Sequence, residues 1–221
     1  NARGAQEVTI RNNLFKDDIG STSSTAAGIV LKDRVNLGST LTAAQLTITN
    51  NNFEDLVVRS INAAGGTFVD TVQALAATNT YSTDANINLF AAEEKILHRL
   101  DDGVSATVQV SAATNDALYV PFSGGATVLQ NAINEVTSSG TVNVQQGTYT
   151  VDSAIVVPIT KSGVTIQGRK ADNQATASET TTGAVNAPKL VAGSALASSI
   201  LQIAGDNVTV RGLELNTLSA T

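Results

Sequence analysis

The side chains that could act as acids, bases or nucleophiles are few in this chain. Adjacent carboxylates occur at Asp17–Asp18 and Asp101–Asp102. An inverting glycosidase needs two carboxylates that flank a water molecule on one surface, and Asp17–Asp18, directly after Phe15 at the expected edge of a turn, are typical of a solvated loop. His98 is the single histidine, with Glu94 four residues before it. That spacing makes a surface pair on a helix, and no Ser or Cys partner for His98 is evident.

Basic residues offer a second kind of chemistry. A polysaccharide lyase needs several carboxylates that bind Ca²⁺ and an Arg or Lys base beside them. Arg11 and Arg211 occupy equivalent positions in two repeated segments, and Glu214 lies close to Arg211 in the sequence. Charges that point outward from a strand are usually only a solvated face, so we expect no catalytic residues, and we find no pattern that supports a Ca²⁺ site.

The composition excludes several other functions. The chain has 221 residues, no Cys and one His, which excludes a disulfide framework, a thiol catalyst and a two-histidine metal motif. A net charge of −6 disfavours nucleic-acid binding. With 42% hydrophobic and 14% charged residues the chain is not disordered, and no apolar run reaches the roughly 18 residues of a membrane span. Because the chain begins with Asn and contains no Met, we expect a processed product or a piece of a longer protein.

Four short segments share one pattern: an apolar residue, Thr, an apolar residue, a polar residue, and then Asn or Gly. They read VTIRN from Val8, LTITN from Leu46, VTIQG from Val164 and VTVRG from Val208. Alternation with a period of two predicts strands whose apolar residues share one face. The opposite face would then carry a ladder of hydroxyls at Thr9, Thr47, Thr165 and Thr209.

The fifth position of each segment predicts a special backbone conformation. It holds Asn12, Asn50, Gly168 and Gly212. Asn and Gly share a tolerance of positive φ. We therefore expect a left-handed residue to end each of these strands.

The spacing of the segments indicates a solenoid. A second apolar strand is expected before three of them, at Ile29, Ile155 and Ile200. With the two termini joined on paper, Val208 to Val8 spans 21 residues, close to the roughly 20 to 25 residues of one solenoid coil. The first stretch of the chain therefore reads as the continuation of its last stretch.

The pattern divides the chain into three parts. Residues 1–65 read as C-terminal-type coils, and residues 119–221 read as the N-terminal entry and first coils of a solenoid. A short capping helix is expected near 126–138, from the apolar stripe of Val128, Leu129, Ala132, Ile133 and Val136.

Residues 66–118 read as a join between the other two parts. The patterns in this join predict short strands around Val69–Val72, Ile87–Phe90 and Val104–Val110. They also predict a short helix in which Ala92, Ile96 and Leu100 lie four residues apart.

The segments ATVLQNAINEV, GTVNVQQGTYTV and SGVTIQGR, between residues 119 and 170, resemble the N-terminal entry of proteins of the pectin-lyase-like superfamily. SILQIAGDNVTVRGLEL and LTITNNNF resemble interior coils of the same fold. The resemblance implies an all-β, right-handed parallel β-helix. It implies no activity, because this fold hosts enzymes, tailspikes, adhesins and surface-array proteins.

The residues that mark the enzymes of this superfamily are missing. Polygalacturonases carry a His-Gly pair, whereas His98 is followed by Arg99. They also carry an Arg-x-Lys segment, whereas Arg169 and Lys170 are adjacent, and Asp84 lacks the Asn of an Asn-Thr-Asp segment.

These patterns favour an extracellular or cell-surface structural protein that assembles head to tail by stacking coils into a filament or array. Its partner would be another copy, or a neighbouring module of the same chain. The residues expected at the junction are Val8, Ile10, Val208, Val210, Leu213 and Leu215. Two alternatives stay open: a polysaccharide lyase or hydrolase on the same fold, and a non-catalytic adhesin that binds extracellular polysaccharide.

Overall fold

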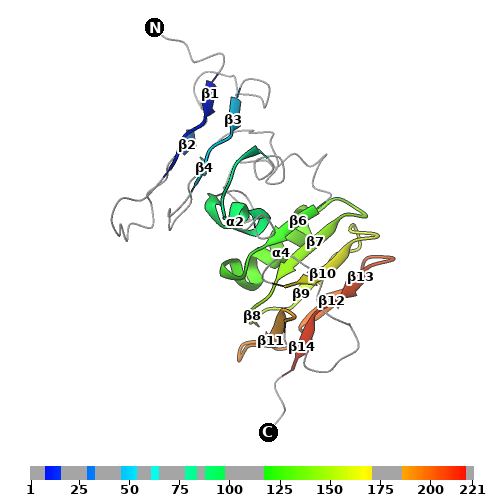
Figure 1. Ribbon diagram of the computed structural model, residues 1–221. Helices are drawn as coiled ribbons and strands as arrows, with labels where there is room; N and C mark the ends of the chain where they lie inside the picture. The colour runs from blue at the N-terminus through cyan, green and yellow to red at the C-terminus, as the bar shows by residue number, and fades with distance from the viewer. Residues whose placement is uncertain are drawn as a thin grey trace. The chain divides into compact units, whose positions relative to one another are not determined.

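The computed structural model (Figure 1) describes residues 8–15, 29–32, 46–53, 61–64, 78–83, 88–97, 117–170 and 186–217. The chain divides into two compact units, Asn1–Ser111 and Ala112–Thr221. The division falls within the segment 66–118 that the sequence marks as a join. In both units the described strands pair in parallel.

The described residues of the second unit form short strands, a 3₁₀ turn and one α-helix. Its elements are β6 (Ala117–Val120), a 3₁₀ turn (Phe122–Gly124), α4 (Gly125–Glu135), β7 (Thr141–Gln145), β8 (Thr148–Val151), β9 (Ile155–Val157), β10 (Thr165–Arg169), β11 (Lys189–Ala192), β12 (Leu201–Ile203), β13 (Thr209–Arg211) and β14 (Glu214–Asn216). The strands form three parallel sheets, in the orders β13-β10-β7-β6, β14-β11-β8 and β12-β9.

The chain of the second unit passes through these three sheets in the same order each time. It runs through β7, β8 and β9, then through β10, β11 and β12, and then through β13 and β14. We call one such pass a rung. The rungs stay in register although their lengths differ: the partners Asn143 and Gln167 are 24 residues apart, and the partners Gln167 and Arg211 are 44 residues apart.

The core of the second unit lies between its sheets. Val142 on β7 and Ile166 on β10 are buried at the same register position. Tyr149 on β8 and Leu190 on β11 form a second buried pair. Thr165, one residue before Ile166, is only half-buried. Neighbouring residues of a strand point to opposite faces, so the apolar residue enters the core and the polar residue does not.

Helix α4, from Gly125 to Glu135, lies where the sequence predicts a short helix near 126–138. It buries one apolar face, made of Val128, Leu129, Ala132 and Ile133, against strands of the first rung. The helix ends at Glu135 because the backbone at Val136 turns to an extended conformation, with φ −57° and ψ 141°.

The described strands of the first unit have four residues each, except the last strand, which has two. The elements of this unit are β1 (Val8–Arg11), β2 (Ile29–Lys32), β3 (Leu46–Thr49), β4 (Ile61–Ala64), α2 (Asn88–Lys95) and β5 (Ile96–Leu97). β1 pairs with β3, and β2, β4 and β5 form a second sheet in that order. Isolated parallel bridges join Leu14 to Asn52 and Asn52 to Thr80. The first unit therefore also repeats a strand, a bridge and a strand.

The helix of the first unit differs from the expectation. The sequence predicts a helix through Ala92, Ile96 and Leu100 and a strand at Ile87–Phe90, whereas α2 begins at Asn88 and ends at Lys95. The physical reason is that Ile96 and Leu97 pair with β4, and a residue in a sheet cannot also continue the helix. The strands predicted at Val69–Val72 and Val104–Val110 lie outside the described residues. No helix among the described residues is long and apolar enough to cross a membrane.

Candidate functional site

The four repeated segments lie in equivalent strands of the two units. In the first unit Thr9 is the register partner of Thr47, on β1 and β3. In the second unit Thr165 is the partner of Thr209, on β10 and β13, and Thr141 on β7 extends this row. The threonines therefore stack in rows on neighbouring strands, with Thr9 and Thr209 exposed.

A left-handed residue ends three of the four segments. Asn12 has a φ of 59°, Asn50 a φ of 57° and Gly212 a φ of 66°. Gly168 differs, because its φ is not positive. A Cβ atom at Gly168 would collide with the carbonyl oxygen of Gly212 on the next rung and would lie 2.8 Å from Cδ of Pro188. The glycine at this position therefore allows two rungs to approach, and it does not serve a turn.

Each segment of the second unit also has a left-handed residue before its strand, which the sequence reading missed. Ser139, Gly163 and Asn207 have φ values of 65°, 73° and 54°. Each lies two residues before the stacked threonine of its rung. The corners stack directly, since the Ser139 N–H donates to Ser162 O at 2.9 Å and the Gly163 N–H to Asp206 O at 2.8 Å. This position holds a different residue type in each rung, so no single residue type marks it in the sequence.

A ladder of asparagines runs along the first unit, one residue after the left-handed position. The side-chain amide of Asn13 donates to Oδ1 of Asn51 at 3.0 Å, and that of Asn51 donates to Oδ1 of Asn79 at 3.0 Å. The backbone N–H groups of Asn13 and Asn51 donate to the same two acceptors, at 3.1 and 3.0 Å. Asn51 and Asn79 are buried, so these hydrogen bonds satisfy amides whose burial would otherwise be costly.

A column of aromatic rings follows the asparagine ladder. The ring centroids of Phe15 and Phe53 are 4.7 Å apart, and those of Phe53 and Tyr81 are 4.9 Å apart. Both ring pairs are stacked nearly in parallel. Phe53 and Tyr81 are buried, while Phe15, the end of the column, is half-buried. Phe15 and Phe53 each lie seven residues after the start of a repeated segment, whereas no repeated segment precedes the third rung at Asn79–Tyr81, so the sequence pattern does not indicate it.

One end of each unit is closed by a helix. In the second unit the Gln130 side chain on α4 takes the place of a neighbouring strand: Nε2 donates to Val156 O at 3.0 Å, and Oε1 accepts from Val156 N at 2.7 Å. In the first unit Nζ of Lys95, the last residue of α2, donates to Phe53 O at 2.6 Å and to Tyr81 O at 2.7 Å. Gln130 thus binds backbone groups that would otherwise need another strand, whereas Lys95 links two neighbouring rungs.

The other end of each unit is an open edge. Among the described residues, β12, β13 and β14 are the last strands of their three sheets. In the first unit, β1 is an edge strand that pairs only with β3. Apolar side chains are exposed at these edges: Leu14 at 59%, Ile203 at 50% and Leu215 at 48%. Of the other residues expected at a junction, Ile10, Val208, Val210 and Leu213 are half-buried, and Val8 is the register partner of Leu46.

Polar side chains also link the rungs through β7, β10 and β13, and two of them, Asn143 and Gln167, are buried. Gln167 donates to Asn143 Oδ1 at 2.7 Å, and Arg211 Nε donates to Gln167 Oε1 at 3.0 Å. Arg169 Nε also reaches Asn143 Oδ1, at 3.1 Å. Arg211 therefore uses part of its guanidinium to hold β13 against β10.

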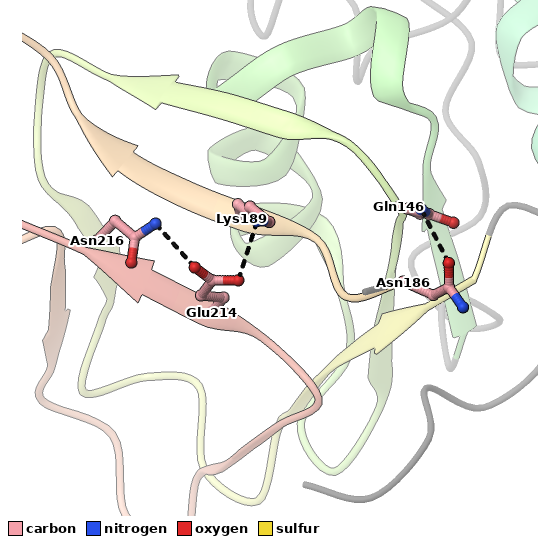
Figure 2. A network of polar contacts seen from close by, with 5 residues as sticks. All are labelled: Gln146, Asn186, Lys189, Glu214 and Asn216. Atoms are coloured by element: carbon pink, nitrogen blue, oxygen red, sulfur yellow. Dashed lines mark hydrogen bonds and ion pairs between the residues drawn. The ribbon is translucent and has the colours of Figure 1, made fainter. Parts of the chain in front are cut away.

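Figure 2 shows a second polar network, between β11 and β14. Asn216 donates to Glu214 Oε1 at 2.9 Å, and Lys189 Nζ lies 3.4 Å from Glu214 Oε2. The hydrogen bond from Asn216 is the main cause that lowers the pKa of Glu214; partial burial opposes it, and Lys189 adds to the lowering. A separate contact joins Gln146 to Asn186 at 3.4 Å. Glu214 is thus a structural carboxylate that pairs the last two rungs.

Of the residues considered for catalysis, several lie outside the described residues: Asp17–Asp18, Asp84, His98 and Asp101–Asp102. Arg211 and Glu214 contact different partners, as described above. In the described ranges no group of three or more His, Asp or Glu side chains could hold a metal ion.

Comparison with known proteins gives no match: no protein-family model, no curated protein and no solved structure matches the chain. The resemblance of short segments to a superfamily is therefore not supported by any whole-chain relative.

Proposed function

We propose that the protein is a structural, extracellular or cell-surface component that assembles head to tail. Each unit is a piece of a right-handed parallel β-helix, and the open edge at β13 and β14 stacks on the β1 edge of the next copy. The observation that carries this proposal is the arrangement of ends: among the described residues each unit has a helix at one end and an unpaired strand edge at the other, and repeated segments of the same pattern lie at both edges.

The topology of the second unit supports the β-helix. From β7 onward its chain returns to each sheet only after passing through the other sheets, and every strand pair is parallel. Crossover connections between parallel strands of one sheet are right-handed in nearly all proteins. The asparagine ladder and the stacked rings of the first unit are the interactions that identical rungs allow when they lie about 4.8 Å apart.

Unpaired strand edges favour association. A sheet edge exposes N–H and C=O groups that bind another strand, and two different edges that fit one another produce an open-ended polymer and not a closed dimer. The same junction could join neighbouring modules of one long chain. The low charged fraction and the absence of Cys fit an extracellular or surface location.

Negative-stain electron microscopy of the purified chain tests the proposal. We expect filaments with an axial repeat shorter than about 100 Å, because each rung adds only about 4.8 Å. Leu215→Lys should shorten them, since Leu215 is exposed at the open edge. Ile159→Lys is the matched control, because Ile159 is 73% exposed but lies outside the edge strands.

Discrete monomers of the wild-type chain would overturn the assembly. The polysaccharide-binding and polysaccharide-cleaving alternatives would then be tested with acidic polysaccharides.

A further inference from the structure

We propose that the junction between two copies has one register, in which Thr209 of one copy lies opposite Thr9 of the next and Leu215 lies opposite Phe15. This inference rests on the proposed head-to-tail assembly and adds the alignment of its strands. The partner is a second copy of this chain, because three features of the two edges match together in this register.

The first matching feature is the direction of the backbone hydrogen bonds. In both units the residue six positions after the start of the repeated segment donates back to the previous rung: Glu214 to Pro188 O at 2.9 Å, and Asn52 to Asn13 O at 2.8 Å. Leu14 is the equivalent residue of the first rung. In the proposed register its N–H donates to Leu213 O of the neighbouring copy.

The second matching feature is the asparagine ladder. Each ladder Oδ1 accepts the backbone N–H of the preceding rung, as Asn51 accepts from Asn13 at 3.1 Å and Asn79 from Asn51 at 3.0 Å. Among the described residues the ladder begins at Asn13. In the proposed register Oδ1 of Asn13 accepts the backbone N–H of Leu213, as the ladder oxygens of Asn51 and Asn79 accept from the preceding rung. Leu213 has no side-chain amide, so the ladder would start at the junction.

The third matching feature is the inner column. Tyr149, Leu190 and Leu215 are register partners in the second unit, and Leu215 is exposed because no rung follows it among the described residues. Phe15 is the half-buried end of the ring column of the first unit. Placing Leu215 against Phe15 joins the two columns and removes apolar surface from water on both edges.

Other registers lose some or all of these matching features. A slip of one residue would turn every side chain to the opposite face. A slip of two residues would keep the faces but would place Leu213 against Phe15. It would also separate the left-handed residues Gly212 and Asn12, which have nearly equal φ values of 66° and 59°.

Disulfide trapping tests the register, because the chain contains no Cys. Thr9 and Thr209 are both exposed, and facing residues of adjacent parallel strands lie about 4.8 Å apart, within the Cα separation that a disulfide tolerates. The double variant Thr9→Cys with Thr209→Cys should form covalent multimers on oxidation. The control Arg11→Cys with Thr209→Cys, which matches the slip of two residues, should form at least tenfold fewer.

The outcomes separate this inference from the proposed function. Filaments that cross-link better in the control than in the Thr9–Thr209 variant would overturn the register and leave the assembly in place. Filaments that cross-link in neither variant would also overturn the register. The absence of filaments in both reduced variants and in the wild-type chain would overturn the proposed function, and the register with it.

Discussion

At the scale of single residues, the Asn and Gly residues that end the four repeated segments do not all serve the same purpose. Asn12, Asn50 and Gly212 supply a left-handed backbone, whereas Gly168 leaves room for the carbonyl oxygen of Gly212. The sequence pattern groups the four together, because both tasks select small or turn-forming residues. Only the stacking of neighbouring rungs separates them, and that stacking depends on contacts between residues far apart in the chain.

The Glu214 carboxylate makes stability depend on pH. Its pKa is lowered in the folded protein, first by the hydrogen bond from Asn216. The stabilisation is therefore present above the unfolded pKa of about 4.3 and is lost as the pH falls through the lower folded pKa. Urea unfolding at pH 7 and pH 3 should show a smaller loss on acidification in Glu214→Gln than in the wild type.

Asn216→Ala serves as the matched variant for this prediction, because it leaves the carboxylate but removes the main cause of the lowered pKa. It should also reduce the loss of stability on acidification. An unchanged pH dependence in both variants would contradict the assigned role of Glu214.

The asparagine ladder shows what the sequence can and cannot indicate about single residues. Asn13 and Asn51 follow the repeated segments and are 38 residues apart, whereas Asn79 follows after only 28 residues and no such segment precedes it. The repeated segments indicate that Asn13 and Asn51 occupy equivalent positions. The third rung, at Asn79, cannot be predicted in this way, because a single Asn in a polar stretch has no local pattern.

At the scale of elements, the alternation of apolar and polar residues predicts the strands well, whereas the helical spacing of apolar residues predicts α4 better than α2. β1, β3, β10 and β13 lie where the repeated segments predict them. Helix α4 follows from its apolar stripe, because that stripe faces a core. Helix α2 begins and ends earlier than its spacing predicts, because strand pairing claims Ile96 and Leu97. Local patterns cannot report this competition between helix and sheet.

The cap formed by α4 should contribute strongly to the stability of the second unit. Ile133 on its buried face is fully inaccessible, and truncating such a residue to Ala typically costs about 2–5 kcal/mol. We expect Ile133→Ala to lower the free energy of unfolding by that amount in urea titrations. Thr127→Ala on the exposed face of the same helix should change it by less than about 1 kcal/mol. Equal effects of the two substitutions would contradict the capping role.

At the scale of the whole molecule, charge opposes the junction that shape and hydrogen bonding favour. In the proposed register Arg211 of one copy faces Arg11 of the next, and both side chains are exposed. Like charges directly opposite on neighbouring strands are destabilising. The assembly would therefore strengthen with salt, since screening weakens interactions between exposed charges.

Reversing one of these charges should strengthen the junction at low salt. An opposite-charge pair across strands contributes roughly 0.2–1 kcal/mol, so Arg11→Glu should lower the critical concentration for filament formation several-fold, measured by light scattering. Combining Arg11→Glu with Arg211→Glu restores a like-charge pair and should cancel the gain. Weaker association of the single variant would contradict the facing of Arg11 and Arg211.

The unequal lengths of the rungs have a practical consequence. The partners Asn143 and Gln167 are separated by 24 residues and the partners Gln167 and Arg211 by 44, yet both pairs lie in register. The height of a rung is set by the backbone pairing of its strands, so it does not depend on how much chain lies between them. Foreign peptides inserted between β10 and β11 could therefore be displayed at fixed spacing without altering the strands that carry them.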